Sequence, residues 1–194
     1  MSLFSPLVLP NGASIPNRIG KAAMEENLAD ADHAPSAELL QIYSAWAEGE
    51  VGLIITGNVM IDARAMTGPG GVLLEDDRHL DRFRAWADAS RCKGAQVWMQ
   101  INHPGRQMPA GLGQETVAPS AIALDLGAQS KQFPMPRELT ADEIAEIAHR
   151  FVTTAKLAEQ AGFTGVQIHA AHGYLLSQFL SPLSNKRQDQ WGGS

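Results

Sequence analysis

Two imidazoles and one phenol lie close together near the end of the sequence, at His169, His172 and Tyr174. They follow a short apolar run with the β-branched residues Val166 and Ile168, which predicts a buried parallel strand. Polar side chains at the carboxyl end of such a strand are typical of catalytic sites in α/β proteins. The pattern therefore predicts a catalytic site built from these three side chains.

Two other interpretations of this cluster stay open. A single histidine at a strand end is more often a core residue hydrogen-bonded to backbone, but burying three polar tips together requires several partners. A metal-dependent hydrolase that uses His169 and His172 is a further alternative, and it predicts inhibition by chelators. A metal site needs three or four ligands. No carboxylate or cysteine lies near the cluster, and the only cysteine, Cys92, falls in a predicted helix far away in sequence. We therefore expect no metal.

Length, charge and composition exclude several classes of protein. A chain of 194 residues suits one domain. The net charge of −6, with acidic and basic residues interspersed, disfavours nucleic acid or an anionic membrane surface as a partner. No apolar run approaches the ~20 residues that span a bilayer, and the N-terminus lacks the basic and apolar regions of a signal peptide. With one cysteine and no disulfide framework, we expect a cytoplasmic protein.

Three modules of helix, glycine and strand precede or contain the cluster. The helices are predicted by apolar stripes at helical spacing and by a Thr140–Glu143 capping box at the start of the third. The predicted helices cover residues 36–48, 80–92 and 140–161. The predicted strands cover residues 51–57, 95–101 and the first half of 162–174, with an additional first strand at 19–24. Glycines 49, 94 and 162 follow the three helices, where C′ glycines belong. Regular alternation of this kind predicts a parallel sheet covered by helices.

The remaining segments are a predicted hairpin and two long loops. Residues 7–9 and 13–15 flank the turn signal Pro10-Asn11-Gly12, which predicts a hairpin that could close one end of a barrel. The loops at 62–77 and 104–138 follow predicted strands. They leave the carboxyl ends of those strands, where a (β/α) barrel builds its site, so we expect them to be functional.

Three motifs, in order along the chain, carry a family resemblance. They are Asn17-Arg18-Ile19 with Ala23-Met24; Gln100-Ile101-Asn102-His103-Pro104-Gly105-Arg106; and His169-Ala170-Ala171-His172-Gly173-Tyr174 with Ser181-Pro182-Leu183-Ser184-Asn185, Arg187 and Gly192-Gly193-Ser194. Together they resemble the Old Yellow Enzyme family of flavin-dependent NAD(P)H oxidoreductases and ene-reductases. The resemblance covers essentially the whole chain and implies an α/β fold of the (β/α)8 TIM-barrel class.

The resemblance also implies a cofactor, a reaction and roles for the clustered residues. FMN would be reduced by NAD(P)H and would pass a hydride to an electron-poor alkene. By matched position, His169 and His172 would bind the carbonyl oxygen of the substrate, where preformed donors stabilise developing negative charge. Tyr174 matches the proton donor, and a phenol with a reference pKa near ~10 is protonated at neutral pH.

Other matched residues would contact the flavin. Gln100 matches a glutamine that reads the pyrimidine edge, and an amide suits this role because it donates and accepts side by side. Ala23, Met24 and Gly57 match positions that line the isoalloxazine ring, although core packing predicts the same residue types. Arg106 would belong to the site loop or brace it.

One departure from the family pattern concerns the flavin directly. Glu25 stands where many members carry a threonine or cysteine that tunes the flavin. A carboxylate facing the ring would disfavour the anionic reduced flavin, and an unchanged midpoint potential in Glu25→Gln would contradict this hypothesis. Trp191 replaces a common tyrosine, and we attach no function to that change.

The sequence predicts only part of a barrel. A complete TIM barrel has eight strands and typically ~250 residues, whereas about four βα units and the N-terminal hairpin are predicted here. We therefore expect residues 1–194 to form one partial FMN-binding barrel domain whose C-terminal half is missing. That half would include the loops that commonly bind phosphate. Its absence would leave open sheet edges, which invite association into a homo-oligomer. The alternative to an active enzyme is an inactive truncated fragment that binds FMN poorly.

Overall fold

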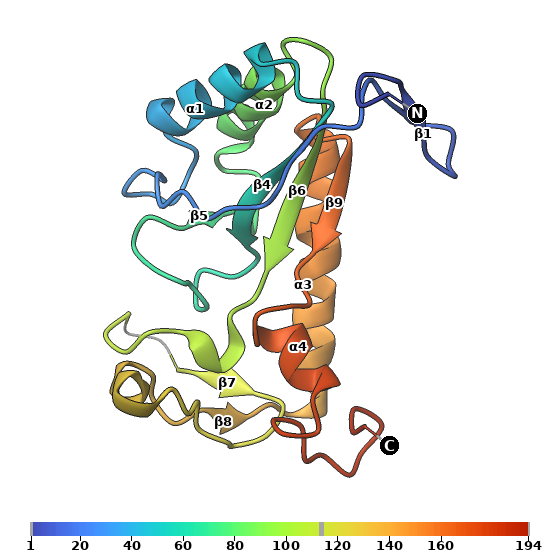
Figure 1. The fold of residues 1–194 in the computed structure, drawn as a ribbon. Helices are drawn as coiled ribbons and strands as arrows, with labels where there is room; N and C mark the ends of the chain where they lie inside the picture. The colour runs from blue at the N-terminus through green and yellow to red at the C-terminus, as the bar shows by residue number, and fades with distance from the viewer. Residues whose placement is uncertain (1, 113–114, 194) are drawn as a thin grey trace.

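The computed structural model describes residues 2–112 and 115–193. Ser194 of the family motif and residues 113–114 of the predicted long loop lie outside the described residues. The main sheet is parallel and runs in the order β3 (Gly20–Lys21), β4 (Leu53–Met60), β6 (Gln96–Asn102) and β9 (Gly165–Ile168), with β5 (Val72–Leu73) paired to the end of β4. In Figure 1 the arrowheads of β4, β6 and β9 point toward the same end of the molecule. The predicted parallel sheet is confirmed.

Three helices pack against one face of this sheet. They are α1 (Ala37–Glu48), α2 (Leu80–Ser90) and α3 (Ala141–Gln160). The side chains of Val97, Met99 and Ile101 on β6 point into the core between sheet and helices and are almost completely buried. Because strand side chains alternate between faces, Gln96, Trp98 and Gln100 point to the opposite face, where they are half-buried. The polar site residues on the strands therefore lie on the face that the helices leave uncovered.

The helix ends follow the sequence signals with two corrections. The Thr140–Glu143 capping box is present at the start of α3, and Gly94 and Gly162 have positive φ angles of 83° and 92°. Gly49 instead has a φ of −72°, and the left-handed residue after α1 is Glu50. Helix α2 ends at Ser90 and not at residue 92, so Cys92 lies in the following turn and is exposed.

Two strands differ from their predicted bounds for a common reason. The register between β4 and β6 shifts between Ile55 and Asn58, and the strand then continues to Met60 instead of ending at Gly57. The N–H of Gly57 donates to the hydroxyl of Tyr43 rather than to a neighbouring strand. Only Gly20–Lys21 of the predicted strand at 19–24 forms β3, paired with Leu53 and Ile54 of β4. The residues after Lys21 lie beside the irregular part of β4 and do not pair with it.

The strand before the histidine cluster is not buried as predicted. β9 pairs with β6 on one side, Val166 is half-buried, and Ile168 is 54% exposed. β3 and β9 are the terminal strands of the sheet. Ile168 therefore has neighbours on one side only and lines an apolar groove of about 460 Å³ between α3 and α4 (Leu175–Leu180).

The hairpin and the loops occupy opposite ends of the molecule (Figure 1). β1 (Leu7–Val8) and β2 (Ser14–Ile15) form the predicted antiparallel hairpin at the amino ends of the strands, and Gln96 donates to the carbonyl of Ser14. The loop after β6 contains the short helices η1 (Gly105–Gln107) and η2 (Gly127–Gln132) and the paired strands β7 (Val117–Ala118) and β8 (Arg137–Glu138). None of the described helices is both long and apolar enough to cross a membrane.

Candidate active site

The three side chains singled out by the sequence meet at the carboxyl end of β9. His169 follows the strand and donates its backbone N–H to the carbonyl of Ile101 on β6, at 3.0 Å. The ring centroid of His169 lies 5.0 Å from that of His172 and 4.8 Å from that of Tyr174, while His172 and Tyr174 are 6.4 Å apart. The three polar tips therefore form one compact group.

The hydrogen bonding of His169 defines which ring nitrogen can donate. Its Nδ1 accepts the backbone N–H of Ala171 at 3.2 Å. Burial, and to a lesser extent the neighbouring His172, lower the pKa of His169 below its usual value. The ring is therefore neutral at neutral pH, and because Nδ1 accepts, its one proton is on Nε2. His169 thus presents an N–H donor and no positive charge.

Tyr174 is a protonated phenol over the physiological range. Its backbone N–H donates to the carbonyl of Ala171 at 3.1 Å, and it is the N-cap residue of α4. Burial, and next the charge of Glu25, raise the pKa of Tyr174 above its usual value. The hydroxyl can therefore donate a proton, and the phenolate form is disfavoured where Tyr174 lies.

The turn between the histidines and the tyrosine has an unusual backbone. His172 and Gly173 both have positive φ angles, of 56° and 73°. The side-chain amide of Gln107 donates to the carbonyl of His172 at 2.6 Å, and a Cβ added at Gly173 would meet that amide nitrogen at 2.7 Å. Glycine at 173 is therefore required by both the backbone angle and the close approach of Gln107.

Gln178 is a positioning residue that the sequence reasoning missed. It is 1% exposed, and its Nε2 donates to the carbonyls of Gly173 at 2.8 Å and Pro104 at 3.1 Å. Its Oε1 accepts the backbone N–H of Arg106 at 3.3 Å. Gln178 thus joins the loop after β6 to the turn that carries Tyr174. An amide within the mostly apolar α4 was the available signal, since a buried amide needs several partners.

The matched flavin residues form a second group in the segment after β3 and on β4 and β6. A Cβ added at Gly57 would collide with the backbone carbonyl of Met24 and with the side chain of Glu26. The structure therefore places Gly57 directly against the segment that contains Ala23, Met24 and Glu25.

Gln100 connects this second group to the histidines. Its Nε2 donates to Oε1 of Gln167 on β9 at 2.7 Å, and the two residues are register partners in the sheet. Gln167 precedes His169 by two residues. The two groups therefore lie on adjacent strands at one end of the sheet.

A buried hydroxyl, also missed from sequence, fixes the segment after β3. Tyr43 on α1 donates to Oε1 of Glu26 at 2.7 Å and accepts the N–H of Gly57 at 2.9 Å. The ammonium of Lys21 donates to the same carboxylate oxygen at 3.1 Å and to the carbonyl of Ile55 at 3.2 Å. One phenol oxygen thus links helix, strand and loop beside the matched flavin residues.

Removing that hydroxyl is expected to destabilise the fold. Tyr43→Phe keeps the ring, which packs edge-on against Trp46 and Trp86, but leaves the buried Gly57 N–H without its acceptor. The free energy of unfolding should fall by about 2–3 kcal/mol, measured by urea denaturation. Tyr174→Phe is the matched control, because it makes the same chemical change at a hydroxyl outside this network and should cost less than ~1 kcal/mol. Equal losses in the two variants would contradict this role of Tyr43.

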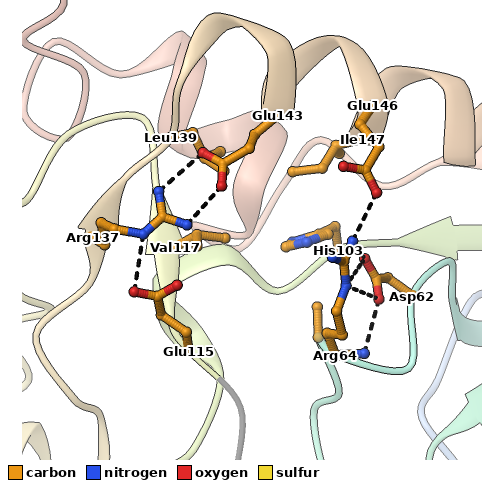
Figure 2. A pocket seen from close by; sticks show the side chains of 11 residues that line it. Asp62, Arg64, His103, Glu115, Val117, Arg137, Leu139, Glu143, Glu146 and Ile147 are labelled. Atoms are coloured by element: carbon orange, nitrogen blue, oxygen red, sulfur yellow. Dashed lines mark hydrogen bonds and ion pairs between the residues drawn. The ribbon is translucent and has the colours of Figure 1, made fainter.

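The structure also contains a charged pocket of about 270 Å³ on the helix side of the strand ends. Two ion-pair groups line it, Arg137 with Glu115 and Glu143, and Arg64 with Asp62 and Glu146 (Figure 2). His103, from the end of β6, is buried beside the second group and accepts the N–H of Gly105 at its Nδ1. None of the residues predicted to be catalytic lines the pocket. Its arginines and carboxylates join the loops after β4 and β6 to α3.

His103 should make the fold sensitive to acid. Burial lowers its pKa from 6.5 to about 4. Its folded-state pKa therefore lies below its unfolded value, and only the unfolded chain takes up a proton between pH 6.5 and 4. Stability should fall across this window as the pH is lowered, by about 3 kcal/mol from His103. Urea denaturation of wild type and His103→Asn at several pH values should give a smaller slope in the variant. The lowered pKa of His169 acts in the same direction in both proteins, and equal slopes would exclude His103 as a source.

Comparison with known proteins identifies the family. Over residues 2–194 the sequence matches the NADH:flavin oxidoreductase / NADH oxidase family. The chain belongs to this family. It is 38% identical to the NADH-dependent flavin oxidoreductase iliE of Hypocrea jecorina, over 97% of the chain and 51% of that protein. It is 43% identical to an NADH oxidase of Thermoanaerobacter brockii, over 93% of the chain and 27% of that protein. This member of the flavin oxidoreductase family spans about half, or less, of the length of these curated relatives.

Solved structures of Old Yellow Enzyme homologues share the fold of this family member. The homologue from Zymomonas mobilis matches with a TM-score of 0.91 and 32% identity, over 100% of this chain and 55% of that one. Morphinone reductase matches with a TM-score of 0.88 and 31% identity, over 99% of this chain and 54% of that one. The predicted fold class is confirmed: the chain corresponds to about half of an Old Yellow Enzyme TIM barrel.

The residues of this flavin oxidoreductase family member fit the cofactor that the family name implies. Gln100 and Gln167 place two joined amides, half-buried, on the sheet face away from the core. Amides offer the alternating donors and acceptors that a flavin pyrimidine edge requires. Gly57, on the neighbouring strand β4, has no side chain that would occupy the space next to Gln100.

Proposed function

We propose that this chain forms the substrate-side half of the active site of an FMN-dependent NAD(P)H oxidoreductase that reduces electron-poor alkenes, such as enones and enoates. The observation that carries the proposal is the state of the His169 ring, which is neutral, with Nδ1 occupied by Ala171 and a proton left on Nε2. An uncharged donor fixed beside His172 and the protonated Tyr174 suits a substrate carbonyl. The names of the relatives support flavin-dependent oxidoreduction.

In this proposal the protein residues bind the substrate and supply one proton. Bound FMN would supply hydride-transfer chemistry, with NAD(P)H as the hydride source and the β-carbon of the alkene as the acceptor. His169 and His172 donate hydrogen bonds to the carbonyl oxygen, where negative charge increases as the double bond is reduced. Tyr174 gives the proton of its hydroxyl to the α-carbon, and solvent restores it. The alkene thus gains one hydride and one proton and becomes the saturated product.

The remaining site residues are proposed to bind the cofactor. Ala23, Met24, Glu25 and Gly57 would line the flavin ring, and Gln100 would hydrogen-bond its pyrimidine edge. Residues 1–194 would form one partial barrel domain. The open sheet ends at β3 and β9 and the apolar groove beside β9 favour the alternative for the isolated chain, which is weak FMN binding and no activity.

Two measurements on the same sample test this function. After FMN is added and free flavin removed, the visible absorption spectrum shows whether the chain retains the cofactor. NAD(P)H oxidation is then followed with and without an enone. Retained flavin with enone-dependent oxidation supports the proposal, whereas retained flavin without it would contradict alkene reduction. A colourless protein with no activity supports the fragment alternative. Size-exclusion chromatography of the same sample tests whether the chain forms a homo-oligomer.

A further inference from the structure

Glu25 places a negative charge in the segment that follows β3 and is matched to flavin-lining residues. Its Oε1 accepts the hydroxyl proton of Thr67, from the loop after β4, at 2.5 Å. Hydrogen bonds to a carboxylate are short and strong, so this contact holds an exposed side chain in one position. None of the ion pairs among the described residues involves Glu25. Its charge is therefore not neutralised by a basic side chain of that part of the chain.

Glu25 and the catalytic candidates lie at the same end of the parallel sheet, because Thr67 follows β4 and His169 follows β9. Gly57 packs against the backbone carbonyl of Met24 and the side chain of Glu26, which flank Glu25 in the sequence. Burial is the main cause of the raised pKa of Tyr174, and the negative charge of Glu25 adds to it. His169 contributes no compensating charge because its ring is neutral.

We propose that Glu25 makes this site selective for neutral or cationic alkenes over alkenes that carry a carboxylate next to the double bond. The inference rests on the proposed function, because it names the substrate class of the same site. A substrate carboxylate bound near Tyr174 would lie in the field of Glu25, and like charges in a partly desolvated site repel each other. The reaction itself is unchanged: one hydride and one proton are added to the alkene.

Three substrates with the same double bond test the selectivity. Dimethyl fumarate, monomethyl fumarate and fumarate carry zero, one and two negative charges. Esters are intrinsically more electron-poor than carboxylates, so the test is the change in the ratio of kcat/KM values between proteins. Glu25→Gln keeps the size of the side chain and an acceptor for Thr67. It should raise kcat/KM for fumarate relative to dimethyl fumarate by about tenfold or more. This is the effect of a charge repulsion equivalent to about one pKa unit, which corresponds to a factor of ten.

The matched control changes the same charge far from the site. Glu159 is exposed near the end of α3, at the opposite end of the sheet from Tyr174. Glu159→Gln should leave the ratio unchanged. Because Glu25 is exposed to solvent, the wild-type preference should also narrow as salt is raised, with a screening length of ~10 Å at 0.1 M.

A titration that needs neither flavin nor substrate checks the position of Glu25. The chain has 2 tyrosines, and burial raises the pKa of Tyr43 far above its usual value. The near-ultraviolet absorbance of tyrosinate therefore reports Tyr174 until the protein unfolds. The titration midpoint should lie above the usual tyrosine value in wild type and in Glu159→Gln, and should move to lower pH in Glu25→Gln.

The outcomes separate the two proposals. A lowered midpoint together with a changed kcat/KM ratio supports the role of Glu25. The role of Glu25 is overturned if Glu25→Gln leaves the titration midpoint unchanged. It is also overturned if wild type and Glu25→Gln reduce the alkenes with the same ratio of kcat/KM values. Either result leaves the proposed function intact. If the flavin-loaded wild type reduces none of the three alkenes, then the proposed function fails and the selectivity fails with it, even where the midpoint moves.

Discussion

Replacing Tyr174 with phenylalanine is expected to slow alkene reduction by about 10²–10⁴-fold, the usual contribution of a general acid. The hydroxyl is the only part removed, and the ring that lies 4.8 Å from the ring of His169 is kept. Proton delivery to carbon would then depend on water, which is a weaker acid than the phenol and is not held next to the α-carbon. Stopped-flow measurement of flavin reoxidation by an enone separates this step from reduction by NAD(P)H.

Two controls distinguish proton donation from a structural effect. Reoxidation of the flavin by a one-electron acceptor needs no proton on carbon. The rate of this reoxidation in the variant should therefore stay within about twofold of the wild-type rate, a difference in activation free energy well below 1.4 kcal/mol. The raised pKa of Tyr174 also predicts that its contribution to the wild-type rate stays constant from neutral pH upward, until the phenol ionises above its usual range. Equal losses with both acceptors would show that the variant had damaged the flavin site and not the proton donor.

Local patterns in the sequence were sufficient to predict the repeated modules of this fold. The capping box at Thr140 and the glycine at 162 define α3 without tertiary information, because each satisfies the backbone groups of one helix end. The regular alternation of helices and strands then predicted that the strands form a parallel sheet. Strand limits were less predictable, since the register shift near Gly57 occurs where the Gly57 N–H bonds to a helix residue, Tyr43, and not to a neighbouring strand.

Residues that position the site were harder to identify than residues that carry chemistry. His169, His172 and Tyr174 are adjacent in sequence, so their spacing predicted the cluster that the ring distances describe. Gln178 acts instead through three backbone groups on two loops, and nothing in its sequence neighbours specifies those loops. The exposure of Ile168 was missed because a β-branched strand residue usually predicts burial, whereas burial depends on which strands and helices surround it.

Replacing His169 with alanine is the second large loss that we expect, about 10²–10³-fold in kcat for alkene reduction. The variant removes one preformed donor, and this donor matters most when the carbonyl oxygen gains charge. KM should change less than kcat, because the ground-state carbonyl is a weaker acceptor than the transition state. Steady-state kinetics with one enone over a range of concentrations measures both constants.

A conservative variant and a distant one make the result specific. In His169→Asn the amide offers an acceptor for the N–H of Ala171 and a separate N–H donor. Part of the lost rate should therefore return. His149→Ala removes an exposed histidine of α3 and should leave both constants unchanged. If asparagine were no better than alanine, then the imidazole would contribute something other than a hydrogen-bond donor. If His169→Ala raised KM and left kcat unchanged, then His169 would act in ground-state binding. Recovery with asparagine would instead identify the transition-state contribution of His169 as that of one neutral hydrogen-bond donor held in place by the backbone of Ala171.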